Sequence, residues 1–102
     1  RAFFPSAEPA RRKIQINRRF AKADEVELHR LMLHELGHVL GLRHEHIHEE
    51  AGGDCVEASP FEVITDYDPY SIMHYPTCGP KKLSNKVLSE LDKEGIGILY
   101  PF

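Results

Sequence analysis

The chain has 102 residues, with 13 lysines and arginines against 16 aspartates and glutamates, and a formal net charge of −3. This length allows one small domain, and the dispersed basic residues exclude an obvious nucleic-acid-binding face. No apolar run approaches the roughly 18 residues that a membrane-crossing helix needs, so we expect a soluble protein with no nucleic-acid or membrane partner. Its core should be modest, and a bound metal or a disulfide would help it fold.

The N-terminal part contains two segments that we predict to be short β-strands. Residues 2–5 are apolar up to Pro5, which stops them, and residues 13–17 alternate polar and apolar side chains. Two strands make a thin sheet, because an isolated pair is marginal in water. The open edge at Ala2–Phe4 could pair with an extended substrate, and an exposed sheet of this kind could also pair with a second copy of the chain.

Asp24 predicts the start of a helix of about 17 residues, with Glu27 three positions later as in a capping box. Apolar residues recur along the turns that follow, on a wide face that predicts a helix buried in the core. This face comprises Val26, Leu28, Leu31, Met32, Leu36, Val39 and Leu40. His29 lies off the face of His34, which favours a place on the surface.

The second half of this helix carries a metal-binding pattern. His34 and His38 are four residues apart, so both imidazoles project from one face of a helix and could share a Zn²⁺ ion. Gly41 can adopt the left-handed conformation that ends a helix, which lets His44 turn back as a third ligand. Three protein ligands leave a position open for water, and Glu35 suits a base acting on that water. The alternative is a set of buried histidines that bind no metal.

The segment after the motif is polar and predicts a loop. His46 and His48 could be further ligands, but we favour exposed loop histidines. Cys55 and Cys78 flank a 22-residue segment without a Cys-x-x-Cys pair, which favours a disulfide, and hence an oxidising compartment, over metal ligation. Residues 61–64 could be a helical turn or extended. Ser89, with an acidic residue at position 92, predicts the start of a final helix.

Several of these residues together resemble the astacin family of metzincin zinc endopeptidases. The resemblance begins at the histidine motif and continues with Glu45, the residue type that astacins carry after the third histidine. Downstream, Ser71–Tyr75 is similar to the astacin Met-turn, and residues 88–100 are similar to the closing helix of the family. The resemblance covers about residues 34–102, and the segments at 2–5 and 14–17 are more weakly similar to the last two metzincin strands.

The resemblance implies an α+β fold: a small β portion, an active-site helix, and an irregular C-terminal subdomain with a Met-turn and a final helix. It implies a single, complete or partial, catalytic domain over 1–102, with 1–33 as the remnant of an upper subdomain and 34–102 as the zinc motif and lower subdomain. The chain is about half as long as an astacin domain, so we expect a fragment of a longer secreted protease or a naturally reduced form.

The resemblance also implies a role for each site residue. The implied zinc ligands are His34, His38 and His44. Glu35 would be the general base and acid, Met73 an apolar floor beneath the zinc, and Tyr75 a phenol that stabilises the oxyanion, although from sequence alone Tyr75 could equally be a core aromatic. The expected function is zinc-dependent hydrolysis of peptide or protein substrates outside the cell. The alternative is a zinc- and peptide-binding fragment with little turnover.

Overall fold

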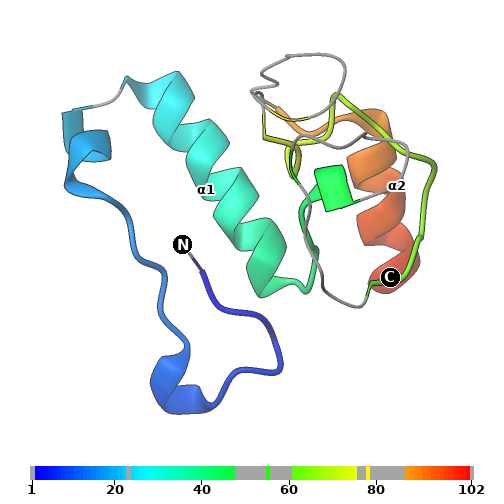
Figure 1. Cartoon of the computed structure of the whole chain (residues 1–102), viewed down its shortest axis with the longest axis horizontal. Helices are drawn as coiled ribbons and strands as arrows, with labels where there is room; N and C mark the ends of the chain where they lie inside the picture. The colour runs from blue at the N-terminus through cyan, green and yellow to red at the C-terminus, as the bar shows by residue number, and fades with distance from the viewer. Residues whose placement is uncertain are drawn as a thin grey trace.

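The computed structural model describes residues 2–22, 24–47, 55, 61–75, 78 and 87–101. These residues form two α-helices, α1 (Glu25–Val39) and α2 (Glu90–Leu99). They also form three 3-10 helices, which are η1 (Pro9–Arg11), η2 (Arg18–Lys22) and η3 (Glu45–Ile47). Residues 2–22 form an arm beside α1, on the side away from α2 (Figure 1). None of the helices in the described part of the chain has the length and apolarity needed to span a membrane.

The predicted α+β fold class is wrong, because the described residues contain helices and no β-strand. The backbone N–H of Ala7 donates to the Phe4 carbonyl at 2.9 Å, so the first predicted strand runs into a turn. Within the described chain, no backbone hydrogen bond joins residues 2–5 to residues 13–17. A cavity of about 460 Å³, lined by residues of both segments, lies between them. Alternation of polar and apolar side chains does not make a strand by itself, because a strand also needs a partner for its backbone groups.

Helix α1 begins and ends where the sequence predicts. Asp24 is the N-cap, and its carboxylate accepts a hydrogen bond from the Glu27 N–H at 2.8 Å. At the other end Gly41 has a φ of 100°, which only glycine adopts without a steric penalty. The N–H groups of Gly41 and Leu42 donate back to the carbonyls of His38 and Gly37, both at 2.9 Å, as in a Schellman motif. This ending turns the chain sharply before His44.

The predicted burial of the apolar face of α1 is only partly right. Val26 is 50% exposed and Leu36 is 44% exposed, whereas the buried residues of α1 are His34, Glu35, Gly37 and His38. The cause is that α1 packs chiefly through its C-terminal half, against the turn around Ile72 and Met73. The N-terminal half stands apart from α2 (Figure 1). His29 is exposed, as predicted.

Helix α2 begins at the predicted cap. Ser89 accepts from the Asp92 N–H, and the Asp92 carboxylate accepts from the Ser89 N–H, which is a complete capping box. At the other end of α2, the Tyr100 hydroxyl donates to the Leu40 carbonyl at 2.7 Å and ties α2 to the end of α1. The predicted disulfide between Cys55 and Cys78 is present. Residues 61–64 adopt neither helix nor strand.

Candidate metal centre

Three imidazoles converge where α1 ends. His34 and His38 come from α1, and His44 follows the turn at Gly41. One ligand nitrogen from each ring lies within 4.8 Å of the others, and the Nε2 atoms of His38 and His44 are 3.2 Å apart. The structure therefore brings together the three residues that the sequence predicted as ligands. This group could hold a metal ion.

Backbone carbonyls fix the orientation of both rings on α1. The Nδ1 of His34 lies 2.8 Å from the Ile72 carbonyl, and the Nδ1 of His38 lies 2.8 Å from the Leu42 carbonyl. A carbonyl only accepts, so each Nδ1 carries the proton and each Nε2 presents a lone pair. Metal-binding histidines are usually held by such a partner on the second ring nitrogen.

The donor set fits a tetrahedral zinc ion. His34 Nε2 is buried and makes no hydrogen bond with any described residue, so its lone pair lacks the partner that a buried polar atom needs. Two nitrogens at the usual zinc distance in a tetrahedral site are about 3.3 Å apart, close to the 3.2 Å between His38 and His44. The two ligand nitrogens that lie farthest apart, within 4.8 Å of each other, must move closer to bind the same ion. Without a metal, the His44 ring would have to donate an N–H to His38.

Burial keeps the His34 ring neutral. Desolvation by burial, with smaller contributions from the nearby His38 and His44, lowers the pKa of His34 from 6.5 to about 4. The Ile72 carbonyl and Glu35 oppose this shift but do not cancel it. His34 is therefore uncharged at neutral pH, which is the form that binds a metal.

Glu35 and Tyr75, the two predicted catalytic residues, both lie beside the histidines. Glu35 follows His34 on α1, is only 7% exposed, and is close enough to raise the pKa of that ring. The Tyr75 ring stacks on His34 with centroids 5.5 Å apart and an interplanar angle of 18°. It also lies 4.4 Å from the His44 ring. Tyr75 is 43% exposed, so it is not a core aromatic. The roles of Glu35 and Tyr75 stay predictions.

Met73 packs directly against the helix that carries two of the histidines. It is 2% exposed, and its sulfur occupies the space that a side chain at Gly37 would fill. Gly37 lies between His34 and His38, so Met73 supports the stretch of α1 that carries both rings. Sequence reasoning missed this requirement for glycine, because the contact joins residues that are 36 positions apart.

The expectation of an exposed His46 is wrong. His46 is 4% exposed, and its ring stacks on His44 with centroids 4.7 Å apart and an angle of 17°. Its Nδ1 accepts from the Tyr75 N–H at 3.4 Å. The polar sequence around His46 predicted a loop but gave no sign that η3 turns inward against residues 71–75. His48 lies outside the described residues.

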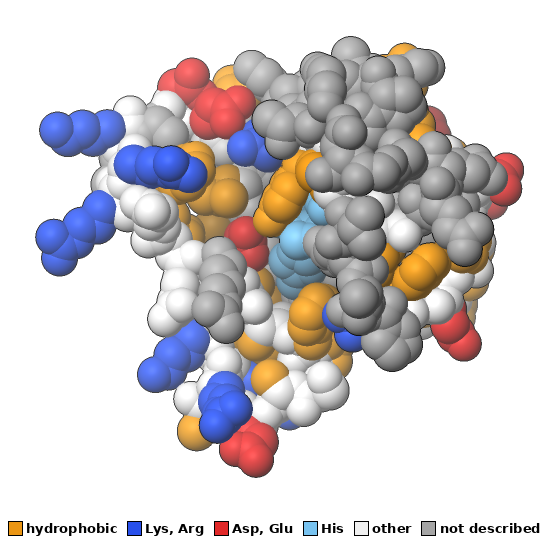
Figure 2. Space-filling model, in the orientation of Figure 1, with side chains coloured by type: hydrophobic (Ala, Val, Ile, Leu, Met, Phe, Trp, Pro, Cys, Tyr) orange, Lys and Arg blue, Asp and Glu red, His pale blue; other side chains and the backbone are white. Residues whose placement is uncertain are grey.

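The N-terminal arm also reaches the site. The Phe4 ring meets His38 edge-on at 5.3 Å between centroids, and the Arg43 guanidinium lies 4.5 Å above the same phenyl ring. This segment therefore covers a histidine instead of offering the predicted strand edge. Histidine side chains are visible at the centre of the face drawn in Figure 2, recessed between hydrophobic side chains.

A cavity of about 520 Å³ has His44 among its lining residues. Its walls are mostly apolar and come from the end of α1, from residues 61–65 and from α2.

Comparison with known proteins finds no relative: no protein family, curated protein or solved structure matches this chain. The structure itself shows a group of three histidines that could hold a metal ion.

Proposed function

We propose that this chain is a zinc-dependent endopeptidase of astacin-like type. The observation that carries the proposal is the convergence of His34, His38 and His44, with the two rings on α1 oriented through Nδ1. Imidazole donors suit zinc, and three of them leave the open position that a catalytic site needs. The resemblance of Ser71–Tyr75 to a Met-turn supports the same class.

In this proposal, Glu35 and Tyr75 each have a separate role in the hydrolysis. Zinc, when bound, supplies Lewis acidity that makes a water more acidic and polarises a carbonyl. Glu35 takes a proton from the attacking water and passes it to the leaving amine. Tyr75 donates a hydrogen bond from its phenolic hydroxyl to the developing oxyanion. The disulfide supports an oxidising, extracellular compartment.

A second candidate is a zinc- and peptide-binding chain with little turnover. The observation that favours it is the conformation of the N-terminal segment. Residues 2–4 form no strand, and Phe4 packs on His38, so the described residues offer no sheet edge to align a peptide. Peptide binding would then depend on contacts other than strand pairing, with weaker alignment of the scissile bond.

A quenched-fluorescence peptide assay with added zinc separates the two candidates. We expect cleavage by the wild-type chain that a chelator abolishes, and a loss of about 10²–10⁴-fold in Glu35→Gln, the range of a general base. Glu25→Gln, at the exposed start of the same helix, is the matched control and should cleave normally. Zinc binding without cleavage by the wild type favours the binding protein. Cleavage by Glu35→Gln at the wild-type rate contradicts the proposed base.

A further inference from the structure

A chain of hydrogen bonds leads away from His34 through the interior. The His34 Nδ1–H donates to the Ile72 carbonyl at 2.8 Å. The N–H of the same peptide group belongs to Met73 and donates to the Ser71 hydroxyl at 3.0 Å. That hydroxyl donates in turn to the Asp92 carboxylate. These hydrogen bonds thus connect an imidazole, a peptide group, a hydroxyl and a carboxylate in series.

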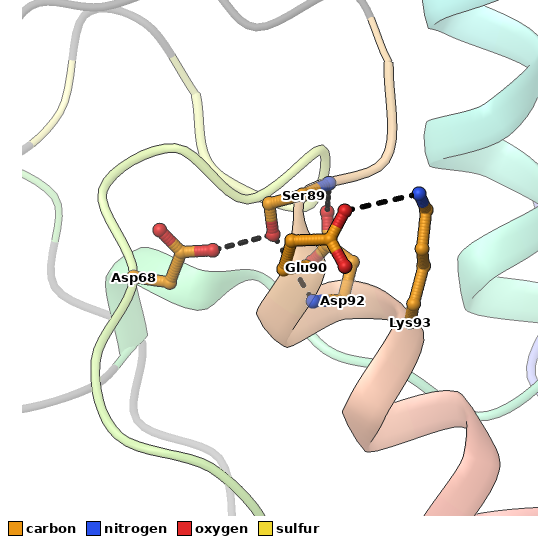
Figure 3. Close-up of polar contacts among 5 residues, drawn as sticks. All are labelled: Asp68, Ser89, Glu90, Asp92 and Lys93. Atoms are coloured by element: carbon orange, nitrogen blue, oxygen red, sulfur yellow. Dashed lines mark hydrogen bonds and ion pairs between the residues drawn. The ribbon is translucent and has the colours of Figure 1, made fainter.

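The Asp92 carboxylate is held from several sides. Its Oδ2 accepts from the N–H groups of Ile72 at 2.8 Å and Ser89 at 3.0 Å. Asp92 also lies in the first turn of α2, where the helix dipole favours a negative charge. Figure 3 shows this end of α2, with Asp92 beside Ser89 and Ser89 bonded to Asp68. The carboxylate is therefore an oriented charge at the far end of the chain.

We propose that Ser71 and Asp92 are positioning residues for the metal centre, acting on His34 through the Ile72–Met73 peptide. This inference rests on the proposed metal site. Hydrogen bonds in series polarise one another, so the carboxylate makes the Ile72 carbonyl a stronger acceptor. A stronger acceptor at Nδ1 fixes the ring and makes Nε2 a better ligand, as a carboxylate does when it contacts a metal-binding histidine directly. Here a hydroxyl and a peptide group transmit the effect.

A purely structural role for this network makes a different prediction. Ser89 belongs to the same cap, since its hydroxyl accepts from the Asp92 N–H and donates to Asp68. Its hydroxyl is not part of the path to His34. If the network only stabilises α2, removal of either hydroxyl should affect the metal centre equally. If the path to His34 matters, only removal of the Ser71 hydroxyl should affect the metal centre.

The test compares Ser71→Ala, Ser71→Thr and the matched control Ser89→Ala by titration with Co²⁺ and by competition with Zn²⁺. We expect Ser71→Ala to bind both ions about tenfold more weakly, the lower end of the effect of an outer partner. Its cobalt absorption bands should shift. Ser71→Thr keeps a hydroxyl and should recover wild-type binding, whereas Ser89→Ala should melt at a lower temperature and bind metal as the wild type does.

Equal losses in Ser71→Ala and Ser89→Ala, or wild-type affinity in Ser71→Ala, overturn the inference. If Ser71→Ala does not fold, the ring signals of His34 in the wild-type NMR spectrum decide. A slowly exchanging, downfield Nδ1 proton that moves in Asp92→Asn supports the path, and a rapidly exchanging one refutes it. A wild-type chain that binds neither ion overturns the proposed function as well, whereas normal wild-type binding with unaffected variants overturns only the path.

Discussion

Replacement of Gly37 by alanine tests how tightly the C-terminal end of α1, which carries His34 and His38, is packed. A methyl group at Gly37 would overlap the sulfur of Met73, which is itself 2% exposed. Overpacking at a buried site costs about 1–3 kcal/mol of the free energy of unfolding. Alanine recovers about 1 kcal/mol through its higher helix propensity. The net expectation is a loss of about 0–2 kcal/mol.

Gly97 supplies the matched control, because it lies in α2 with nothing within 4 Å of an added methyl group. Gly97→Ala gains the higher helix propensity of alanine without any overlap with a neighbouring side chain. It should therefore be more stable than the wild type by up to about 1 kcal/mol. The difference between the two variants isolates the packing cost. Urea unfolding of the metal-free chain measures it, and each kcal/mol corresponds to about 4–8 °C in Tm for a domain near this size.

A second substitution identifies the overlapping group. Met73→Ala in the Gly37→Ala background should offset part of the packing cost, so the two changes should be non-additive in a double-mutant cycle. The reasoning fails if Gly37→Ala gains as much stability as Gly97→Ala. It also fails if the cycle is additive, since Met73 would then not be the obstacle.

Three further predictions follow from particular residues. Gly41→Ala should lose about 1–2 kcal/mol of stability and weaken zinc binding, because φ is 100° there, and unchanged urea midpoints would contradict this. Reduction of Cys55–Cys78 should cost about 3 kcal/mol, measured by urea unfolding with and without reductant, and coincident curves would contradict it. Burial raises the pKa of Glu45 from 4.5 to about 7, so the folded, metal-free chain binds more protons than the unfolded chain between these values. The contribution of Glu45 to stability should therefore be full below pH 4.5 and be lost as the pH rises through 7. The difference in the free energy of unfolding between the wild type and Glu45→Gln, from urea titrations at pH 4.5 to 8, measures this contribution, because the lowered pKa of His34 changes the stability of both chains in the opposite sense.

Local features of the sequence predicted local features of the structure well. The caps at Asp24 and Ser89 are intrinsic to a few neighbouring residues, because a side-chain oxygen meets a backbone N–H three positions later. The turn at Gly41 likewise depends on one residue. The spacing of His34, His38 and His44 placed the three rings together because helix geometry and a single turn determine it.

Features that depend on distant partners escaped prediction. The alternation in residues 13–17 satisfies a strand, but no partner strand exists among the described residues, so the segment stays irregular. The burial of His46 depends on residues 71–75 folding over η3. The need for glycine at position 37 depends on Met73, and the path from His34 to Asp92 depends on where α2 docks. These contacts form between elements and leave no mark in a local pattern.

Zinc stoichiometry in matched histidine variants tests the central claim most directly. Competition with a chelating dye should show a single zinc ion per chain in the wild type and in His29→Ala, which removes an exposed histidine from the same helix. His44→Ala, which removes the least buried of the three proposed ligands, should lose affinity by more than the roughly 10–100-fold typical of an outer partner. Zinc binding by His44→Ala as tight as that of the wild type, or no zinc binding by the wild type, would contradict the account.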